Sequence, residues 1–151
     1  MQVFDRHLSD SDKTPKVTFE NEDVRIFKET HCSHEIRTAE KLSRRGIRCC
    51  FVNDNIQELD RNGKPTGRSN YADLDNGMEI KVLNSASSYN TINGHLKNAS
   101  KKLNATSVVF DNNENKCLTD EKLAEYLRRS QAFKYGSVYM LTCEDRLIRI
   151  K

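Results

Sequence analysis

Residues 71–83 read YADLDNGMEIKVL and predict two short strands joined by a tight turn at residues 75–77. Asn-Gly in a short loop is the strongest local signal for a β-hairpin. Side chains alternate along a strand, so the apolar residues of the second strand share one face, and Glu79 and Lys81 share the other. Asp73 lies on the first strand. We therefore expect the hairpin to hold two acids and a lysine close together, an arrangement suited to a divalent cation and a phosphate.

The composition is that of one folded, polar domain. Of the 151 residues, 36% are hydrophobic and 31% charged, enough for one domain with a core and too few for two. No apolar run approaches the ~20 residues of a membrane-spanning helix, and the N-terminus has no apolar signal-peptide segment. We expect residues 1–32 to be an extended or partly ordered lead-in, with weak edge strands at 17–19 and 24–27. Residues 33–151 are expected to form the domain.

The basic residues are unevenly distributed along the chain. The net charge is only +3, but residues 85–104 contain no acid and three lysines, Lys97, Lys101 and Lys102. Residues 126–151 contain six bases and two acids. Either cluster alone is explained by a solvated surface. Together with the acids and the lysine of the hairpin, they favour a polyanionic substrate.

The cysteines do not form a recognisable framework. They lie at positions 32, 49, 50, 117 and 143, an odd number without CxxC spacing, so free and mostly buried thiols are expected. His31, Cys32 and His34 are close in sequence. No second ligand pair follows at the spacing of a zinc finger, so zinc is not indicated.

Helices and strands are predicted to alternate over the rest of the chain. Ser33 is of the N-cap type, apolar residues recur at helical spacing, and Gly46 ends the helix. Glu35 in its first turn is also explained by the helix dipole. Strands are predicted at 47–52, 78–82, 107–111, 136–143 and 146–150, helices at 90–103 and after Thr119, and a small hairpin around 61–64. This order predicts an α/β sandwich around one mixed sheet.

The candidate residues occur in the order Glu35, Asp73 and Glu79-Ile80-Lys81. This arrangement resembles the PD-(D/E)XK nuclease superfamily, whose restriction-endonuclease-like fold has a central mixed β-sheet flanked by helices. The predicted elements from 33 to 111 follow the order of that core. The resemblance implies that Asp73 and Glu79 bind Mg²⁺ or Mn²⁺, that Glu35 is a third acid, and that Lys81 positions or activates the attacking water. Carboxylate oxygens are ligands that suit Mg²⁺.

Two departures from the family pattern concern the first half of the hairpin. Ala72 stands where the family name has proline. Asp75 lies two residues after Asp73 and competes with it as a metal ligand. We prefer Asp73, because Asp75 begins the turn and has a structural role there.

More narrowly, the HExxxA helix, the DLDNGMEIK hairpin and the serine-rich turn resemble C-terminal toxin domains of contact-dependent growth inhibition systems. The resemblance implies a tRNA-cleaving nuclease that acts in the cytoplasm of a target bacterium, is delivered as part of a larger secreted protein, and is neutralised by a cognate immunity protein. It also implies substrate contacts from Ser85, Ser87, Ser88, Asn90, Asn93, Lys97 and Lys101. Ordinary turn chemistry explains the serines equally well. We expect His95 on the helix surface.

Other readings stay open on the sequence alone. A DNA endonuclease of the same fold uses the same acids and lysine, and no RNA-binding motif is recognisable. A non-catalytic module that binds nucleic acid or protein is the alternative from another class. An immunity-type partner protein is disfavoured, because such a protein needs no cluster of two acids and a lysine.

Overall fold

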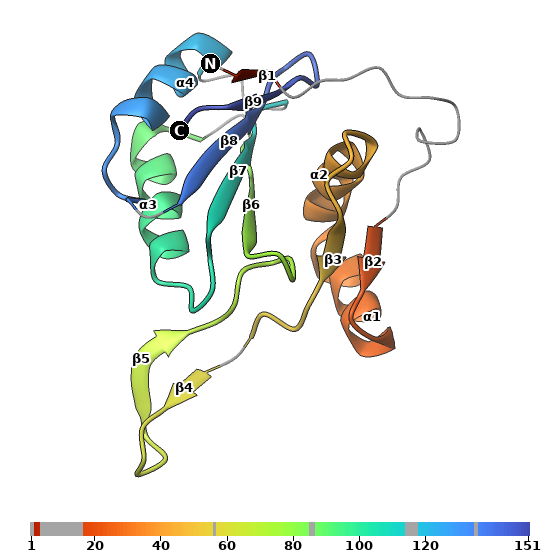
Figure 1. Cartoon of the computed structure of the whole chain (residues 1–151), viewed down its shortest axis with the longest axis vertical. Coiled ribbons are helices and arrows are strands. Elements are labelled where there is room, and N and C mark those ends of the chain that lie inside the picture. The colour runs from red at the N-terminus through yellow and green to blue at the C-terminus, as the bar shows by residue number, and fades with distance from the viewer. Residues whose placement is uncertain (1, 4–16, 56, 85–86, 114–117, 135) are drawn as a thin grey trace.

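A five-stranded mixed sheet forms the centre of the molecule (Figure 1). The computed structural model describes residues 2–3, 17–55, 57–84, 87–113, 118–134 and 136–151. The strand order is β1-β9-β8-β7-β6. Strands β6, β7 and β8 are parallel, whereas β9 and β1 are antiparallel to their neighbours. The strands are β1 (Gln2–Val3), β6 (Met78–Val82), β7 (Ser107–Asp111), β8 (Ser137–Leu141) and β9 (Leu147–Arg149).

Helices cover both faces of this sheet, which confirms the predicted α/β class with a mixed sheet. Helices α3 (Tyr89–Ser100) and α4 (Asp120–Arg129) lie on one face, and α1 (Glu22–His31) and α2 (Ser33–Arg44) lie on the other (Figure 1). Each layer has its own apolar cluster. Phe110 of β7 is buried under α3 and α4, and its neighbour Val109 is buried under α2, as alternation along a strand requires.

The first half of the predicted hairpin is not a regular strand. Only Leu74 forms a bridge, to Phe51. The segment nevertheless joins β6 to β3 (Cys49–Phe51), which pairs in parallel with β2 (Val17–Phe19). The N–H of Leu74 donates to the Met78 carbonyl at 3.2 Å, and the N–H of Asp75 donates to the Cys50 carbonyl at 2.9 Å. Residues 73–75 therefore connect the small β2–β3 pair to the main sheet.

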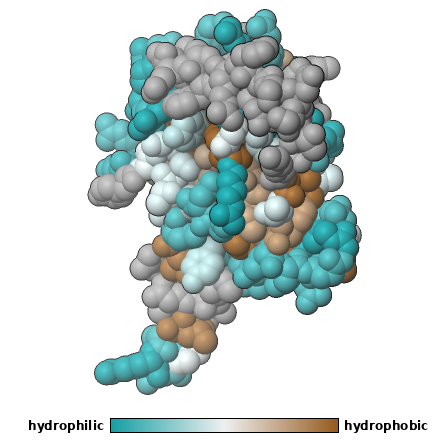
Figure 2. Space-filling view, turned by 45° about the vertical axis from the view of Figure 1, so that its right-hand side comes forward, coloured by the Kyte–Doolittle hydropathy of each residue, from teal (hydrophilic) through white to brown (hydrophobic). Residues whose placement is uncertain are grey.

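The long polar stretch before the hairpin contains a second hairpin, as predicted around residues 61–64. Strands β4 (Gln57–Leu59) and β5 (Pro65–Ser69) are antiparallel. The carboxylate of Asp60 accepts the N–H groups of Asn62 and Lys64 at 2.8 and 3.0 Å, which closes the turn. This hairpin projects from the body of the molecule, and its tip is hydrophilic (Figure 2).

The expected strand at residues 24–27 is wrong, because these residues belong to helix α1. Asn21 caps this helix by accepting the N–H of Val24 at 2.9 Å, and two acids follow in the first turn. The start signal of a helix outweighs a short alternation. Val24 also lies in the apolar cluster of α2, so the core continues across residue 33, where we placed the domain boundary. Most of the predicted lead-in, residues 4–16, lies outside the described residues.

Smaller expectations for the N-terminal half have mixed outcomes. The strand predicted at 17–19 is β2. Cys32 rather than Ser33 is the N-cap of α2, and its side chain makes no cap hydrogen bond. The cysteines at 32, 49, 50 and 143 are free, as expected, but of these four only Cys49 is buried, so the expectation of mostly buried thiols is wrong for them. Cys117 lies outside the described residues. In the described part of the chain, no helix combines the length and apolarity needed to cross a bilayer.

Replacing Gly77 with alanine tests the turn that sets the hairpin. Gly77 has φ +85, and an added Cβ would lie 2.6 Å from Thr106 Oγ1 and 2.8 Å from the Asn104 carbonyl oxygen. We expect Gly77→Ala to lower the free energy of unfolding by about 2–4 kcal/mol, combining left-handed strain with overpacking. Gly63 is the matched control, since its φ is +79 and a Cβ there meets nothing within 4 Å. Equal losses for both variants in urea unfolding would contradict the tight approach at Gly77.

Candidate active site

Asp73 and Glu79 form a carboxyl pair at the point where the 73–75 segment meets β6. The backbone N–H of Asp73 donates to Glu79 Oε1 at 3.2 Å, and the N–H of Ile80 donates to Asp73 Oδ2 at 2.7 Å. The two carboxyl groups also share a hydrogen bond. Glu79 is 2% exposed and Asp73 is half-buried. The turn at residues 75–77 folds the chain back so that these acids meet.

Two lysines flank Glu79 from different parts of the chain. Lys81 Nζ and Lys102 Nζ each lie 3.5 Å from Glu79 Oε2. Lys81 is two residues along β6, so it shares a face with Glu79, and this face lies under α3. The predicted grouping of Asp73, Glu79 and Lys81 is therefore present.

The two acids are in opposite electrostatic situations. Burial, the hydrogen bond with Glu79 and the charge of Glu79 raise the pKa of Asp73 well above its usual value, against the Ile80 N–H and the charge of Lys28. Burial also opposes ionisation of Glu79. The hydrogen bond from Asp73 and the charges of Lys81 and Lys102 outweigh it, so the pKa of Glu79 is lowered. Asp73 therefore holds its proton to a higher pH than Glu79 does.

Neither Asp75 nor Glu35 makes a described contact with the carboxyl pair. Asp75 is in the turn, and its carboxylate lies 3.7 Å from Arg48, in line with the structural role expected for it. Glu35 is half-buried in the first turn of α2. Burial and the negative charges of Glu35, Asp73 and Asp54 raise the pKa of the Cys32 thiol, against the charge of Lys28. Cys32 thus lies within electrostatic range of both Glu35 and Asp73, although no described hydrogen bond or ion pair joins Glu35 to Asp73 or Glu79.

The carboxyl pair supplies two of the ligands that a hard cation needs. Within the residues that the structure describes, no three His, Cys, Asp or Glu side chains are grouped so as to hold a metal ion, so Glu35 does not complete a preformed set. Mg²⁺ is commonly held by one or two carboxylates, with waters and substrate phosphate oxygens filling its other positions. Two neighbouring carboxyl groups fit that requirement, and Asp73, whose pKa is raised, must lose its proton to serve as a ligand.

A lysine that the sequence did not single out reaches the carboxyl pair from the end of α3. Lys101, a predicted substrate contact, is exposed at the C-cap, and that contact stays a prediction. The helix ends at Ser100, and the N–H of Lys102 donates to the Ala99 carbonyl at 3.1 Å. This turn brings Lys102, rather than Lys101, to Glu79. No glycine or proline marks the end of α3 in the sequence, so the helix was predicted to continue to residue 103 and the position of Lys102 beside Glu79 was missed.

The other predicted substrate contacts have separate positions. The Ser87 hydroxyl is buried and accepts the Asn84 N–H at 3.0 Å, and the Ser88 hydroxyl caps α3 by accepting the Thr91 N–H. Both serines therefore have turn or cap roles. Asn90 and Lys97 are exposed on α3, Asn93 is half-buried there, and Ser85 lies outside the described residues. Substrate contact by these residues stays a prediction.

His95 is closer to the site than expected. Its side chain is half-buried, not on the helix surface, and its ring centroid lies 6.5 Å from that of Phe110. Burial and the charge of Lys81 lower the pKa of His95, against the charge of Glu79. At neutral pH the imidazole is uncharged, so it is suited to donate or accept a hydrogen bond beside Lys81.

Lys28 was missed because its region was read as a strand. Its side chain is 3% exposed, and its Nζ lies 3.1 Å from Asp54 Oδ1. The helical spacing places Lys28 beside Val24, because residues four apart lie on the same face of a helix, and both are buried in α1.

Comparisons of the chain with protein-family models, with curated proteins and with solved structures gave no match.

Proposed function

We propose that this protein is a Mg²⁺- or Mn²⁺-dependent endonuclease that hydrolyses phosphodiester bonds. The observation that carries the proposal is the Asp73–Glu79 carboxyl pair with Lys81 beside it. Burying two acids against one another lowers the stability of the fold unless a cation compensates their charge. Perturbed acids of this kind are typical of functional sites. A lysine on the same strand face is placed to act where a phosphate would meet a cation.

The proposed division of labour follows from the positions of the side chains. Asp73 and Glu79 would hold the cation, which supplies charge stabilisation at the phosphate. Lys81 is a mobile point charge with three donors, 19% exposed and able to turn from Glu79 towards a water or a phosphate oxygen. Lys102 keeps Glu79 ionised while Lys81 is engaged. Neutral His95 contributes a hydrogen bond beside them.

The finer parts of the proposal rest on the resemblance of the sequence. The order of α2, β3, the 73–75 segment, β6, α3 and β7 supports a restriction-endonuclease-like core. We propose RNA, and tRNA in particular, as the substrate, with DNA the alternative. The toxin reading adds delivery as part of a larger secreted protein, action in the cytoplasm of a target bacterium, and a cognate immunity protein.

A non-catalytic nucleic-acid-binding module is the second candidate. One observation favours it: among the described residues, no third acid joins the pair, and two lysines already neutralise Glu79. Such a module would use the cations to bind phosphates and would have no Mg²⁺-dependent cleavage.

Mg²⁺ is expected to stabilise the folded protein through the carboxyl pair. At tenfold excess over its dissociation constant, a ligand adds about 1.4 kcal/mol, which is a rise of roughly 3–6 °C in Tm for a domain of this size. The rise should disappear in Glu79→Gln, which keeps the shape of the side chain. Glu121→Gln, an exposed acid of α4, is the control and should keep it. Equal shifts in all three proteins, measured by thermal unfolding, would exclude Glu79 as a ligand.

A further inference from the structure

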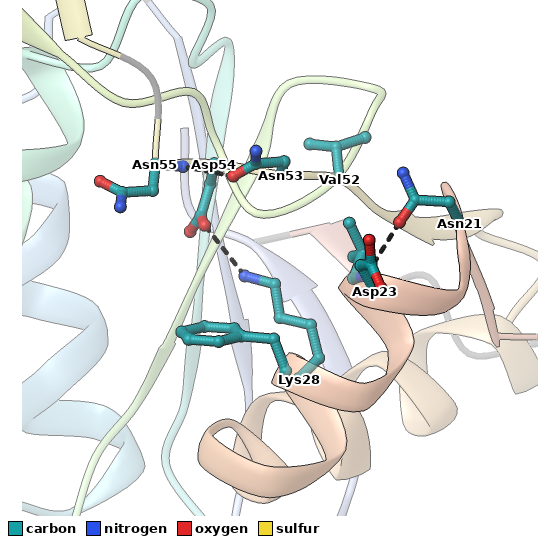
Figure 3. Close-up of a pocket in the computed structure, with 9 residues that line it drawn as sticks. Asn21, Asp23, Lys28, Val52, Asn53, Asp54 and Asn55 are labelled. Carbon is teal, nitrogen blue, oxygen red and sulfur yellow. Dashed lines mark hydrogen bonds and ion pairs between the residues drawn. The ribbon is translucent and has the colours of Figure 1, made fainter.

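A cavity of about 380 Å³ lies between α1 and the segment that follows β3 (Figure 3). It shares a wall with the carboxyl pair. Val52, which lines the cavity, donates its N–H to the carbonyl oxygen of Asp73 at 3.2 Å. The charge of Lys28, on the opposite wall, lowers the pKa of Asp73. A substrate group in this cavity would therefore lie next to the proposed cleavage site.

One side of the cavity is built from a buried ion pair on aromatic rings. Lys28 reaches from α1 to Asp54 on the facing segment (Figure 3), and its Nζ lies 5.8 Å from the ring centroid of Phe51 and 5.9 Å from that of Phe27. The lysine is thus already neutralised. With Asp23 also lining the cavity, an anionic phosphate would meet two carboxylates and one paired cation. The charge balance favours an uncharged ligand.

The remaining lining suits a flat polar ligand. The Phe27 ring contacts that of His31, with centroids 4.8 Å apart, and Phe27 is still 52% exposed, which leaves part of its surface open to a ligand. Asn21 and Asn53 use their side-chain oxygens to accept the N–H groups of Val24 and Asn55. Their amide NH₂ groups have no partner among the described residues and stay available as donors. An aromatic face beside amide donors and carboxylate acceptors is the usual environment of a splayed-out nucleobase.

We propose that this cavity receives one unpaired nucleobase of a single-stranded segment of the substrate, with Phe27 as the stacking platform. The inference rests on the proposed nuclease function and deepens it. It makes the preferred substrate a single-stranded RNA loop or end rather than a continuous duplex. Because the N–H of Val52 on the cavity wall donates to the Asp73 carbonyl, the backbone that flanks a base held here would pass beside Asp73.

The test measures, by fluorescence anisotropy, how tightly fluorescein-labelled oligonucleotides bind to the full chain in EDTA. The probes are a 12-nucleotide single-stranded RNA, DNA of the same sequence, and the fully paired RNA duplex. Phe27→Ala should bind the single strand about 5- to 150-fold more weakly, the loss of one base–aromatic stack. Its affinity for the duplex should be unchanged. Phe27→Tyr should restore single-strand binding, and Ile26→Ala, equally exposed on the same helix, should not alter it.

The proposal is overturned if Phe27→Ala binds the single strand as tightly as wild type, or if it loses duplex binding to the same extent. Absence of single-strand binding by the wild type also overturns it. If Phe27→Ala weakens binding of the RNA and DNA single strands equally, the cavity is a base pocket that does not distinguish ribose from deoxyribose. If only RNA binding is weakened, the pocket is specific for RNA. Binding in EDTA does not depend on cleavage by a metal-dependent nuclease, so these outcomes are separate from the nuclease proposal, which fails on its own if the wild type binds but never cleaves.

Discussion

Lys81→Ala is expected to abolish cleavage while leaving nucleic-acid binding intact. Removing a positioned proton-transfer or charge-stabilising group costs on the order of 10²–10⁴-fold in rate. The variant should fold, because Lys102 still lies 3.5 Å from Glu79 and keeps that buried carboxylate paired. Rates are measured on RNA with Mg²⁺ present, and affinity is measured separately in EDTA.

The control for Lys81→Ala is Lys122→Ala, an exposed lysine of α4. It removes the same charge from the chain, so it corrects for a general loss of attraction to a polyanion. A parallel loss of binding and cleavage in Lys81→Ala alone would make Lys81 a binding residue. No change in cleavage would remove it from the mechanism.

Asp73→Asn is expected to make the protein more stable and inactive. The amide can still accept the Ile80 N–H, and its NH₂ group can donate to Glu79, so the local hydrogen bonds survive. The buried negative charge is gone, which we expect to raise the free energy of unfolding by on the order of 1 kcal/mol at pH 8. Cleavage should fall to background, because a neutral amide is a poor ligand for Mg²⁺.

The gain in free energy of unfolding from Asp73→Asn should increase with pH. The folded protein raises the pKa of Asp73 above 3.8, so the unfolded chain releases this proton first. The contribution of Asp73 to wild-type stability is therefore fully present below pH 3.8 and is lost as the pH rises through the raised pKa. The difference between variant and wild type should be about zero near pH 3.5 and should grow as the pH rises towards the raised pKa of Asp73.

Urea unfolding at a series of pH values measures this difference. Asp75→Asn is the matched control, because Asp75 lies on the same segment but outside the carboxyl pair. A destabilised Asp73→Asn at pH 8 would mean that Asp73 is a structural acid, and it would remove the main support for a functional pair. A flat pH dependence would show that its carboxyl group is not perturbed.

Local signals predicted most of the fold, since they are strong where they are short-range. The Asn-Gly turn, the cap at Thr119 and the short apolar run at residues 107–111 all correspond to observed elements. Helix α1 was missed because an apolar alternation over four residues fits a strand as well as part of a helix. Its cap at Asn21 decided the outcome.

The core of the candidate site was predictable from the hairpin alone. Alternation put Glu79 and Lys81 on one face, and the turn brought Asp73 to them. Lys102, Lys28 and Asp54 were not predictable, because their positions depend on where a helix ends and on which segments pack together. The half-burial of His95 likewise follows from packing against Phe110 of β7, which no sequence spacing encodes.

Cleavage of total RNA and plasmid DNA by the purified protein, with Mg²⁺ or with EDTA, tests the nuclease proposal most directly. The wild type should fragment RNA in Mg²⁺, and the fragments should be absent in EDTA and with Lys81→Ala. Fragmentation of DNA in place of RNA would keep the nuclease and change its substrate. Full activity in EDTA, or no cleavage of either nucleic acid in Mg²⁺, would contradict a metal-dependent nuclease built on Asp73, Glu79 and Lys81.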